Sequence, residues 1–228
     1  AANVIKGIAK GCELANCSLV GGETAEHPGA FPENSFDLAG FAVGVVEETE
    51  ILGTEGSKND DILIGLESSG FHSNGFSLIR KVINDYDLDL EKKIGGEKLG
   101  NILLKPTHVY VNEILALKKI TSINAIAHIT GGGFNENIPR MLGKNQKAII
   151  EHDFEDWPSG KYFKWLMKMT GIPKENLVNT FNCGVGLIIS VDKSKEENVL
   201  GALNQSLFAK TIGKVQEKEP NESQVSYV

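Results

Sequence analysis

The sequence predicts an α/β or α+β fold with one mixed sheet. Apolar runs typical of buried strands alternate with amphipathic helical patterns through the middle of the chain, and the last two β-rich segments follow one another without a helix. Helices between strands form crossovers, whereas consecutive strands pair as neighbours, so we expect both kinds of connection in one sheet. The expected strands are residues 60–66, 123–129, 147–151, 185–191, 208–216 and 223–227, and the expected helices are 73–84, 107–119, 134–142, 160–170, 173–180 and 193–206.

The N-terminal quarter predicts only part of a domain. An amphipathic helical pattern opens the chain, and strands are expected at 19–22 and 36–46. The polar, turn-forming segment 53–60 predicts a boundary between a domain at 1–56 and a domain at 57–228. Roughly 50 residues bury little surface for a stable unit. The first helix also lacks an N-cap, so we expect upstream sequence to be missing.

Composition narrows the classes of partner. The chain has 228 residues, a net charge of −7 and 41% hydrophobic residues, which is ordinary for a globular protein. An acidic chain without a run of Lys or Arg is not expected to bind nucleic acid. Three cysteines, an odd and sparse number, predict a reducing compartment without disulfides. No apolar run is long enough to cross a membrane. We therefore expect a cytoplasmic protein with no membrane partner.

Three consecutive glycines, Gly131, Gly132 and Gly133, form the most informative motif. They lie between an expected strand and an expected helix. Glycines let a ligand approach backbone N–H groups at the positive end of a helix, so this turn predicts a phosphate site. The alternative is a tight turn that binds nothing. The spacing matches neither the P-loop nor the dinucleotide motif, so neither of those mechanisms applies.

A second strand–loop–helix junction, ESSGFHSNG at 67–75, strengthens the phosphate interpretation. Hydroxyl, amide and imidazole groups can bind phosphate, ribose hydroxyls or a base edge. Ser73 or Asn74 is expected to cap the following helix. The alternative is a capped helix start with a surface histidine. The polar side chains of this loop are Ser68, Ser69, His72, Ser73 and Asn74.

A third loop, GGETAEHPG at 21–29, carries two carboxylates three residues apart, Glu23 and Glu26. Magnesium prefers a few hard oxygens and keeps its waters, so this loop is suited to hold Mg²⁺ near a nucleotide. An ordinary solvated acidic turn is the alternative.

The fourth loop contains Cys183, in FNCGVG at 181–186. The flanking sequence offers no histidine partner, and a small thiol beside a strand is more often buried packing than a nucleophile. We expect a packing role.

The chain carries five motifs in a fixed order: GGETAEHPG, SGFHSNG, KPTHVYV, HITGGGFNENIPR and FNCGVG. Together they resemble the motifs of the phosphoribosylformylglycinamidine cyclo-ligase (aminoimidazole ribonucleotide synthetase) family, over essentially the whole chain. The resemblance implies two α+β domains, a partial N-terminal one and a C-terminal one with a mixed sheet. It implies that N-terminal strands pair between subunits into the barrel of a homodimer. It also implies a reaction of purine biosynthesis: formylglycinamidine ribonucleotide and ATP give aminoimidazole ribonucleotide, ADP and phosphate.

The resemblance assigns residues as well. His72 would carry the proton, because an imidazole titrates near neutral pH and this one lies in a polar loop. ATP and Mg²⁺ would be bound at Gly22, Glu23, Thr24 and Glu26, with Glu23 as the metal ligand. The phosphorylated substrate would be bound at Ser69, Gly70, Ser73, Asn74, Gly131, Gly132, Gly133, Asn182 and Gly184.

Members of this family usually have a longer N-terminal part that carries nucleotide-binding residues. We therefore expect little ring-closing activity from this chain alone. Two alternatives stay open. One is a non-catalytic domain that binds phosphorylated ligands or serves in assembly. The other is a different member of the same ATP-using superfamily, such as a small-molecule kinase, which SGFHSNG and FNCGVG disfavour.

Overall fold

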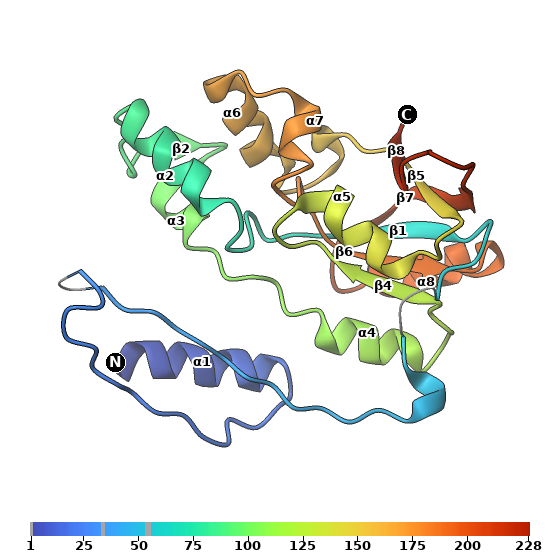
Figure 1. Cartoon of the computed structure of the whole chain (residues 1–228), viewed down its shortest axis with the longest axis horizontal. Coiled ribbons are helices and arrows are strands. Elements are labelled where there is room, and N and C mark those ends of the chain that lie inside the picture. Colours follow the sequence, from blue (N-terminus) through green and yellow to red (C-terminus); the bar gives the residue numbers. More distant parts are fainter. Residues whose placement is uncertain (1, 33–34, 53–55) are drawn as a thin grey trace. The chain divides into compact units, whose positions relative to one another are not determined.

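The structure, a computed structural model, describes residues 2–32, 35–52 and 56–228. The chain divides into two units, Ala1–Ile51 and Leu52–Val228 (Figure 1). Each unit is described by itself. The domain boundary expected after residue 56 stays a prediction, because residues 53–55 lie outside the described residues.

The second unit is built on a six-stranded sheet with the strand order β4-β6-β1-β7-β5-β8. Neighbouring strands are antiparallel except β5 and β8, which run parallel. The predicted mixed sheet is therefore confirmed. Its strands are β1 (Ile62–Glu67), β4 (Ala125–His128), β5 (Gln146–Ile150), β6 (Val185–Val191), β7 (Ala209–Glu217) and β8 (Val225–Tyr227).

Helices connect most of these strands. The helix predicted at 134–142 divides into α5 and the 3₁₀ helix η2, which has Pro139 in its first turn. Proline has no N–H to continue an α-helix, which accounts for the change. A short hairpin, β2 (Lys93–Ile94) with β3 (Glu97–Lys98), lies where the sequence predicted neither helix nor strand. The helices are α2 (Phe76–Asp85), α3 (Leu99–Leu103), α4 (Val111–Lys118), α5 (Gly133–Asn137), η2 (Ile138–Met141), η3 (Phe154–Asp156), α6 (Gly160–Thr170), α7 (Lys174–Leu177), η4 (Lys193–Lys195) and α8 (Glu196–Leu203).

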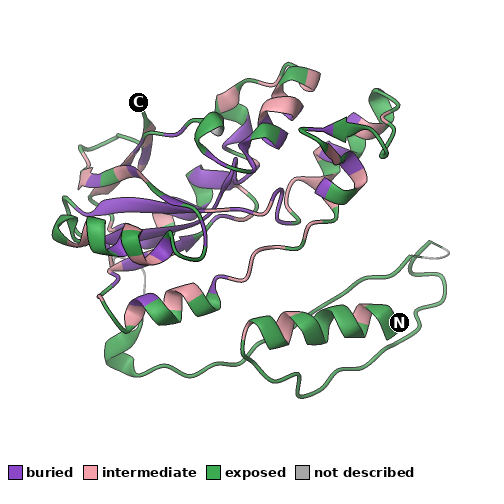
Figure 2. Ribbon diagram, turned by 180° about the vertical axis from the view of Figure 1, so that it is seen from behind, coloured by how far each residue is buried: buried purple, intermediate pink, exposed green. Residues whose placement is uncertain are grey.

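The sheet has a hydrophobic core on each face. Leu63 of β1 and Ile188 of β6 belong to the core under α5 and η2, whereas Ile64 and Ile189 belong to the core under α4 and α8. This alternation follows from the two-residue period of a strand. A third core gathers α2, α3, α6 and α7 at one end of the unit (Figures 1 and 2). The loop after β1 and the loop before β6 contribute Phe71, Phe181 and Cys183 to this third core.

The first unit corrects two predictions. Helix α1 (Ala2–Leu14) forms as expected, followed by the short 3₁₀ helix η1 (Glu48–Glu50). The segments 19–22 and 36–46, expected as strands, have no strand structure in their described residues. A strand exists only where its backbone pairs with another, and the six strands of the second unit pair among themselves. The side chains of the described part of this unit are nearly all exposed (Figure 2).

Candidate ligand-binding site

A buried amide, that of Asn182, holds two of the predicted loops together. Its Nδ2 donates to the carbonyl oxygen of Gly70 at 2.9 Å. Its Oδ1 accepts from the N–H of Gly184 at 2.9 Å and from Ser68 Oγ at 3.0 Å. The N–H of Ser68 donates to the carbonyl of Gly184 at 2.8 Å. The loop after β1 and the loop before β6 therefore form one hydrogen-bonded framework, as buried polar groups require.

A second buried amide, that of Asn137 in α5, shapes the glycine turn from inside. Its Nδ2 donates to the carbonyl oxygens of Gly133 at 2.7 Å and Gly131 at 3.2 Å, and its Oδ1 accepts from Thr130 Oγ1 at 3.1 Å. Asn137 was not among the residues predicted for the site. The available signal was an asparagine four residues after the last glycine, within the helix that follows the turn.

The three glycines serve different purposes. A β carbon on Gly133 would lie 1.9 Å from the carbonyl oxygen of Val178, so Gly133 is needed for packing. Gly132 has a φ of +86°, in the left-handed region that glycine tolerates best. A β carbon on Gly131 would meet only Asn74 Oδ1, at 3.8 Å. The glycine turn and the 67–75 loop are therefore neighbours at Asn74.

Fewer N–H groups face outward than the sequence predicted. The N–H of Gly133 donates to Thr130, and the N–H of Phe134 donates to Val178. The N–H groups of Gly131 and Gly132 have no hydrogen-bond partner within the described ranges. Because α5 has only five residues, its dipole is small. A phosphate at this turn would therefore depend on two backbone donors.

The structure corrects the premise on which His72 was chosen. Only 3% of the residue is exposed, and its Nε2 accepts from the N–H of Ser69 at 3.0 Å and of His108 at 3.2 Å. Burial, and then the neighbouring His128 and His108, lower the pKa of His72 to about 4. The imidazole is therefore neutral at pH 7. Truncating this side chain would leave a buried cavity and would therefore destabilise the fold.

The helix cap expected at Ser73 or Asn74 is also wrong. The N-cap of α2 is Gly75, in the left-handed region and without a side-chain cap hydrogen bond. Ser73 has a φ of +60° itself, and Asn74 Nδ2 donates instead to the carbonyl of His72 at 2.8 Å. A β carbon on Gly75 would lie 2.1 Å from the ring of Phe181. Left-handed non-glycine residues are strained, and such strain gathers at functional sites.

The KPTHVYV segment, residues 105–111, packs against the same loop. Ser69 Oγ donates to the carbonyl of Pro106 at 2.6 Å, and Tyr110 Oη donates to the carbonyl of Glu67 at 2.6 Å. With the bond from the His108 N–H to His72, three hydrogen bonds join the segment to the loop. The sequence analysis quoted this motif but assigned none of its residues to the site.

Exposure divides the predicted substrate residues into two groups. Ser73 and Gly131 are exposed, and Ser69, Asn74 and Gly132 are half-buried. These five can meet a ligand. The others form the framework beneath them, namely Gly70, His72, Gly133, Asn182 and Gly184, which are buried.

An exposed polar trio, which the sequence analysis also missed, lies beside the glycine turn. Tyr227 Oη donates to Asn135 Oδ1 at 2.6 Å, and Asn135 Nδ2 donates to Asn179 Oδ1. Asn135 belongs to α5, Asn179 precedes the fourth loop and Tyr227 ends β8. No sequence spacing connects these three residues.

The residues expected to bind ATP and Mg²⁺ lie in the first unit. Gly22, Glu23, Thr24 and Glu26 are all exposed, in a segment without helix or strand. Over the part of the chain that the structure describes, no group of three or more His, Cys, Asp and Glu side chains is arranged to hold a metal ion. Exposed carboxylates fit Mg²⁺ that is bound mainly by phosphates and water. These assignments stay predictions.

The expectation of a packing role for Cys183 is supported by its surroundings. The residue is fully buried in the third core, and burial raises the pKa of its thiol above the ordinary value. A thiol that resists ionisation is a poor nucleophile.

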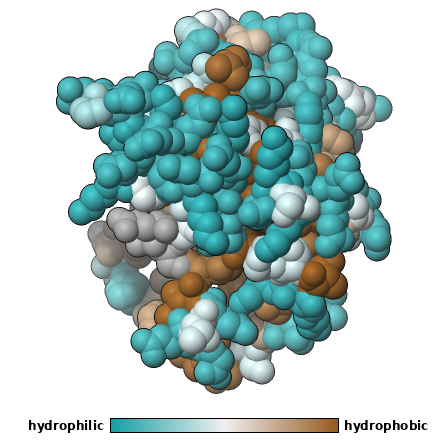
Figure 3. Space-filling view, turned by 90° about the vertical axis from the view of Figure 1, so that its right-hand side faces the viewer, coloured by the Kyte–Doolittle hydropathy of each residue, from teal (hydrophilic) through white to brown (hydrophobic). Residues whose placement is uncertain are grey.

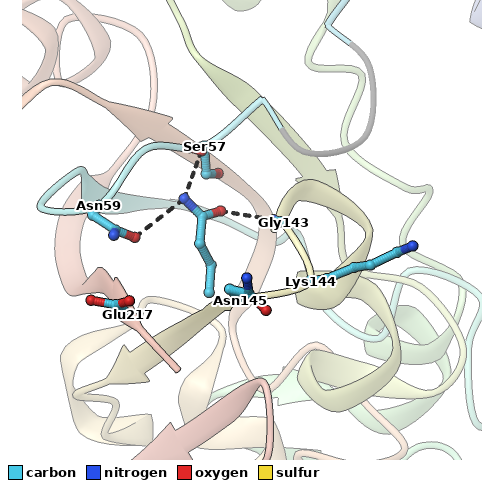
Figure 4. A pocket seen from close by; sticks show the side chains of 7 residues that line it. Ser57, Asn59, Gly143, Lys144, Asn145 and Glu217 are labelled. Carbon is cyan, nitrogen blue, oxygen red and sulfur yellow. Dashed lines mark hydrogen bonds between the residues drawn. The ribbon is translucent and has the colours of Figure 1, made fainter. Parts of the chain in front are cut away.

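A polar groove of about 500 Å³ lies away from these loops (Figure 4). In it, Gln146 donates to the carbonyl of Ser57 and to Asn59 Oδ1, and accepts from the N–H of Gly143. Lys144 points away from the other lining side chains. The amide of Gln146 is thus already engaged in holding the surrounding chain segments together.

Comparison with known protein families decides the membership. The family model described as "AIR synthase related protein, C-terminal domain" matches residues 58–226, most of the chain. The model of the N-terminal domain of the same family matches residues 1–46. The chain belongs to the AIR synthase related protein family.

Three solved structures align with part of this chain, and the first of them shows a similar fold. Thiamine-monophosphate kinase from Stenotrophomonas maltophilia K279a is 14% identical, with a TM-score of 0.53 over 80% of this chain and 54% of that one. E. coli HypE, a hydrogenase maturation protein, is 21% identical, with a TM-score of 0.47 over 77% and 49%. AaThiL, solved in complex with AMPPCP and TMP, is 18% identical, with a TM-score of 0.47 over 76% and 49%. The chain spans about half the length of these structures.

Among the described residues, no helix is both long and apolar enough to cross a membrane.

Proposed function

We propose that this chain serves an ATP-dependent cyclo-ligase, which converts formylglycinamidine ribonucleotide to aminoimidazole ribonucleotide with release of ADP and phosphate. The observation that carries the proposal is the junction of SGFHSNG, the glycine turn and FNCGVG around Asn182 and Asn74. These are the motifs that distinguish the cyclo-ligases from other ATP-using relatives. Their convergence in one place supports a shared site for a phosphorylated substrate.

In this proposal the outer residues bind the substrate. Ser73, Asn74 and the N–H groups of Gly131 and Gly132 supply donors for the phosphate and ribose oxygens of the ribonucleotide. Phosphoryl transfer needs positioning and charge neutralisation more than covalent chemistry from the protein. The framework beneath these residues provides that positioning, because its hydrogen bonds fix the loop backbones before the substrate arrives.

His72 has a positioning role in the proposal, in place of the proton transfer expected from its sequence. Its Nε2 lone pair is taken by two backbone N–H groups, and its pKa near 4 leaves it neutral in the working range. The ring thereby sets the distance between the 67–75 loop and the KPTHVYV segment.

ATP and Mg²⁺ complete the reaction. Gly22, Glu23, Thr24 and Glu26 are proposed to bind them, with Glu23 as the magnesium ligand. The exposed carboxylates would hold the metal, which would supply charge neutralisation for the phosphates. A homodimer formed through the first unit, as in the cyclo-ligase family, belongs to the same proposal.

The test is to supply the purified protein with ATP, Mg²⁺ and formylglycinamidine ribonucleotide and to follow ADP and aminoimidazole ribonucleotide together. Binding of the ribonucleotide alone, measured by titration calorimetry, is expected even if turnover is slow. Serine and asparagine side chains at positions 73 and 74 should be needed for that binding, so Ser73→Ala and Asn74→Ala should weaken it.

A small-molecule kinase acting on a phosphorylated substrate is the second candidate, since a thiamine-monophosphate kinase shares the fold. The two differ in their products. Formation of ADP with thiamine monophosphate, but not with formylglycinamidine ribonucleotide, would replace the cyclo-ligase proposal with the kinase.

A further inference from the structure

Helix α6 presents a lysine-rich face away from its core. Tyr162, Phe163 and Leu166 are buried in the third core. On the other side, Lys161, Lys164 and Lys168 recur at three- and four-residue spacing. Residues three or four apart share one face of a helix, so these lysines form a stripe.

The β2–β3 hairpin supplies the opposite wall of a groove. Its volume is about 470 Å³, and five of its nine lining residues are lysines, although the net charge of the chain is −7. These lysines do not form a cluster in the sequence, because they come from two segments far apart in the chain. The groove is lined by Lys92, Lys93, Ile94, Gly95, Lys161, Lys164, Trp165, Lys168 and Met169.

Four of the five groove lysines have no ion-pair partner among the described residues. Lys164 pairs with Glu155. The described residues place no carboxylate within 4 Å of Lys92, Lys93, Lys161 or Lys168. Clustered ammonium groups of this kind produce a local positive potential even on an acidic protein, since charges beyond about 8 Å are screened at physiological salt.

The groove is also partly pre-organised and partly apolar. A β carbon on Gly95 would lie 2.9 Å from Lys161 Cδ, so the hairpin backbone already contacts the lysine stem. Lys161 Nζ lies 5.3 Å from the ring centroid of Tyr162. Buried Ile94 and half-buried Trp165 and Met169 supply apolar surface between the lysines.

We propose that this lysine groove binds an acidic segment of a partner protein. Carboxylates of the segment lie over Lys92, Lys93, Lys161 and Lys168, and an apolar side chain of the segment packs on Trp165. A nucleic acid fits less well, because a long polyanion would extend beyond the groove over a chain whose net charge is −7, whereas a short acidic segment contacts the lysines alone. The proposal does not depend on the proposed enzymatic function.

The test uses the full chain and a blocked peptide of glutamates interrupted by one phenylalanine and one leucine. Titration calorimetry gives the affinity, and Trp165 emission reports contact in the groove. A peptide with glutamines in place of the glutamates is the matched ligand control. We expect binding of the acidic peptide only, and binding should weaken as salt is raised.

Two double variants locate the binding. Lys161→Glu with Lys168→Glu should weaken the acidic peptide roughly tenfold or more, because two attractions become repulsions. Lys144→Glu with Lys214→Glu changes the net charge equally at exposed positions outside the groove and should leave the affinity nearly unchanged. Equal loss in both pairs, tighter binding of an oligothymidylate than of the peptide, or no binding at all would each overturn the proposal.

Discussion

Asn182 Nδ2 donates a hydrogen bond of 2.9 Å to the carbonyl oxygen of Gly70, across 112 positions of sequence. With the bonds that Ser68 makes to Asn182 and Gly184, this contact joins the two loops whose motifs distinguish the proposed enzyme. Because Asn182 is fully buried, its amide has no water to replace the partners that it would lose.

Replacing Asn182 with Ala should therefore reduce both stability and substrate binding. Leaving buried donors and acceptors unpaired costs about 2–4 kcal/mol when several hydrogen bonds are lost together. Urea unfolding should show this decrease, whereas Asn145→Ala, at an exposed position, should unfold like the parent. A stable Asn182→Ala protein with normal ribonucleotide affinity would show that the loops do not need the hydrogen bonds of the Asn182 amide.

The glycine turn allows ligand effects to be separated from folding effects. Gly131→Ala adds a methyl group where the nearest atom is 3.8 Å away, so it should fold normally and obstruct the ligand. Gly133→Ala places a β carbon 1.9 Å from a carbonyl oxygen at a φ of +56°, so it should lose about 1–3 kcal/mol or more of stability.

Thermal unfolding and titration calorimetry on both glycine variants make the comparison. Weaker ribonucleotide binding by a fully stable Gly131→Ala protein is the expected result. Unchanged affinity in that variant would mean that the turn has only a structural purpose. Gly132 is unsuitable for this comparison, because a φ of +86° strains any side chain placed there.

The fold was largely predictable because burial leaves a strong periodic signal. β6 and α6 begin and end at the expected residues, since Val185–Val191 is mostly apolar, and Gly160 begins and Gly171 follows an amphipathic helix. The strand predictions at 19–22 and 36–46 were wrong, because a β-forming composition does not make a strand unless the segment pairs with a partner strand. The β-propensity of a residue reflects its packing against neighbouring strands as much as a preference of its backbone.

The loops that form the candidate site could be predicted from sequence motifs, but the buried hydrogen bonds that hold these loops together could not. Glycine and serine patterns identified the loops that come together. The amide of Asn137 and the exposed Tyr227 could not be found, because their partners are set by the tertiary fold. His72 is the clearest case in which the sequence was insufficient. The polar residues around it suggested an exposed imidazole, whereas the ring is buried and accepts hydrogen bonds from two backbone N–H groups.

His72 should act through its position. The amide oxygen of His72→Gln can accept the N–H groups of Ser69 and His108, whereas His72→Ala cannot. We expect His72→Ala to raise the KM for the ribonucleotide and to destabilise the fold, and His72→Gln to restore much of both. A pH profile of kcat that keeps its shape in His72→Gln would agree with a positioning role; loss of kcat in the Gln variant with normal KM and stability would instead indicate proton transfer.

Stability should fall between pH 6.5 and about 4. Burial lowers the pKa of His72 and of His152 to about 4 from an ordinary 6.5, so the unfolded chain binds these protons before the folded one does. Protons bound preferentially by the unfolded state favour unfolding, which places full stability above pH 6.5. Urea unfolding at several pH values should show the slope, and His72→Gln should flatten part of it. A flat profile in the parent protein would contradict this assignment.

The first unit should drive self-association. Phe41, Val43 and Val45 alternate along one segment and are 95%, 83% and 101% exposed. Figure 3 shows hydrophobic side chains reaching the surface, most of all in the lower part of that view. Apolar surface of this extent favours association, and an unpaired β-rich segment can pair with the same segment of a second copy.

Light scattering should therefore give a mass above that of one chain, and Phe41→Lys with Val43→Lys should shift it towards the monomer. Lys144→Glu with Lys214→Glu serves as the control at unrelated surface positions. A parent protein that stays monomeric at high concentration would rule out association through residues 18–47.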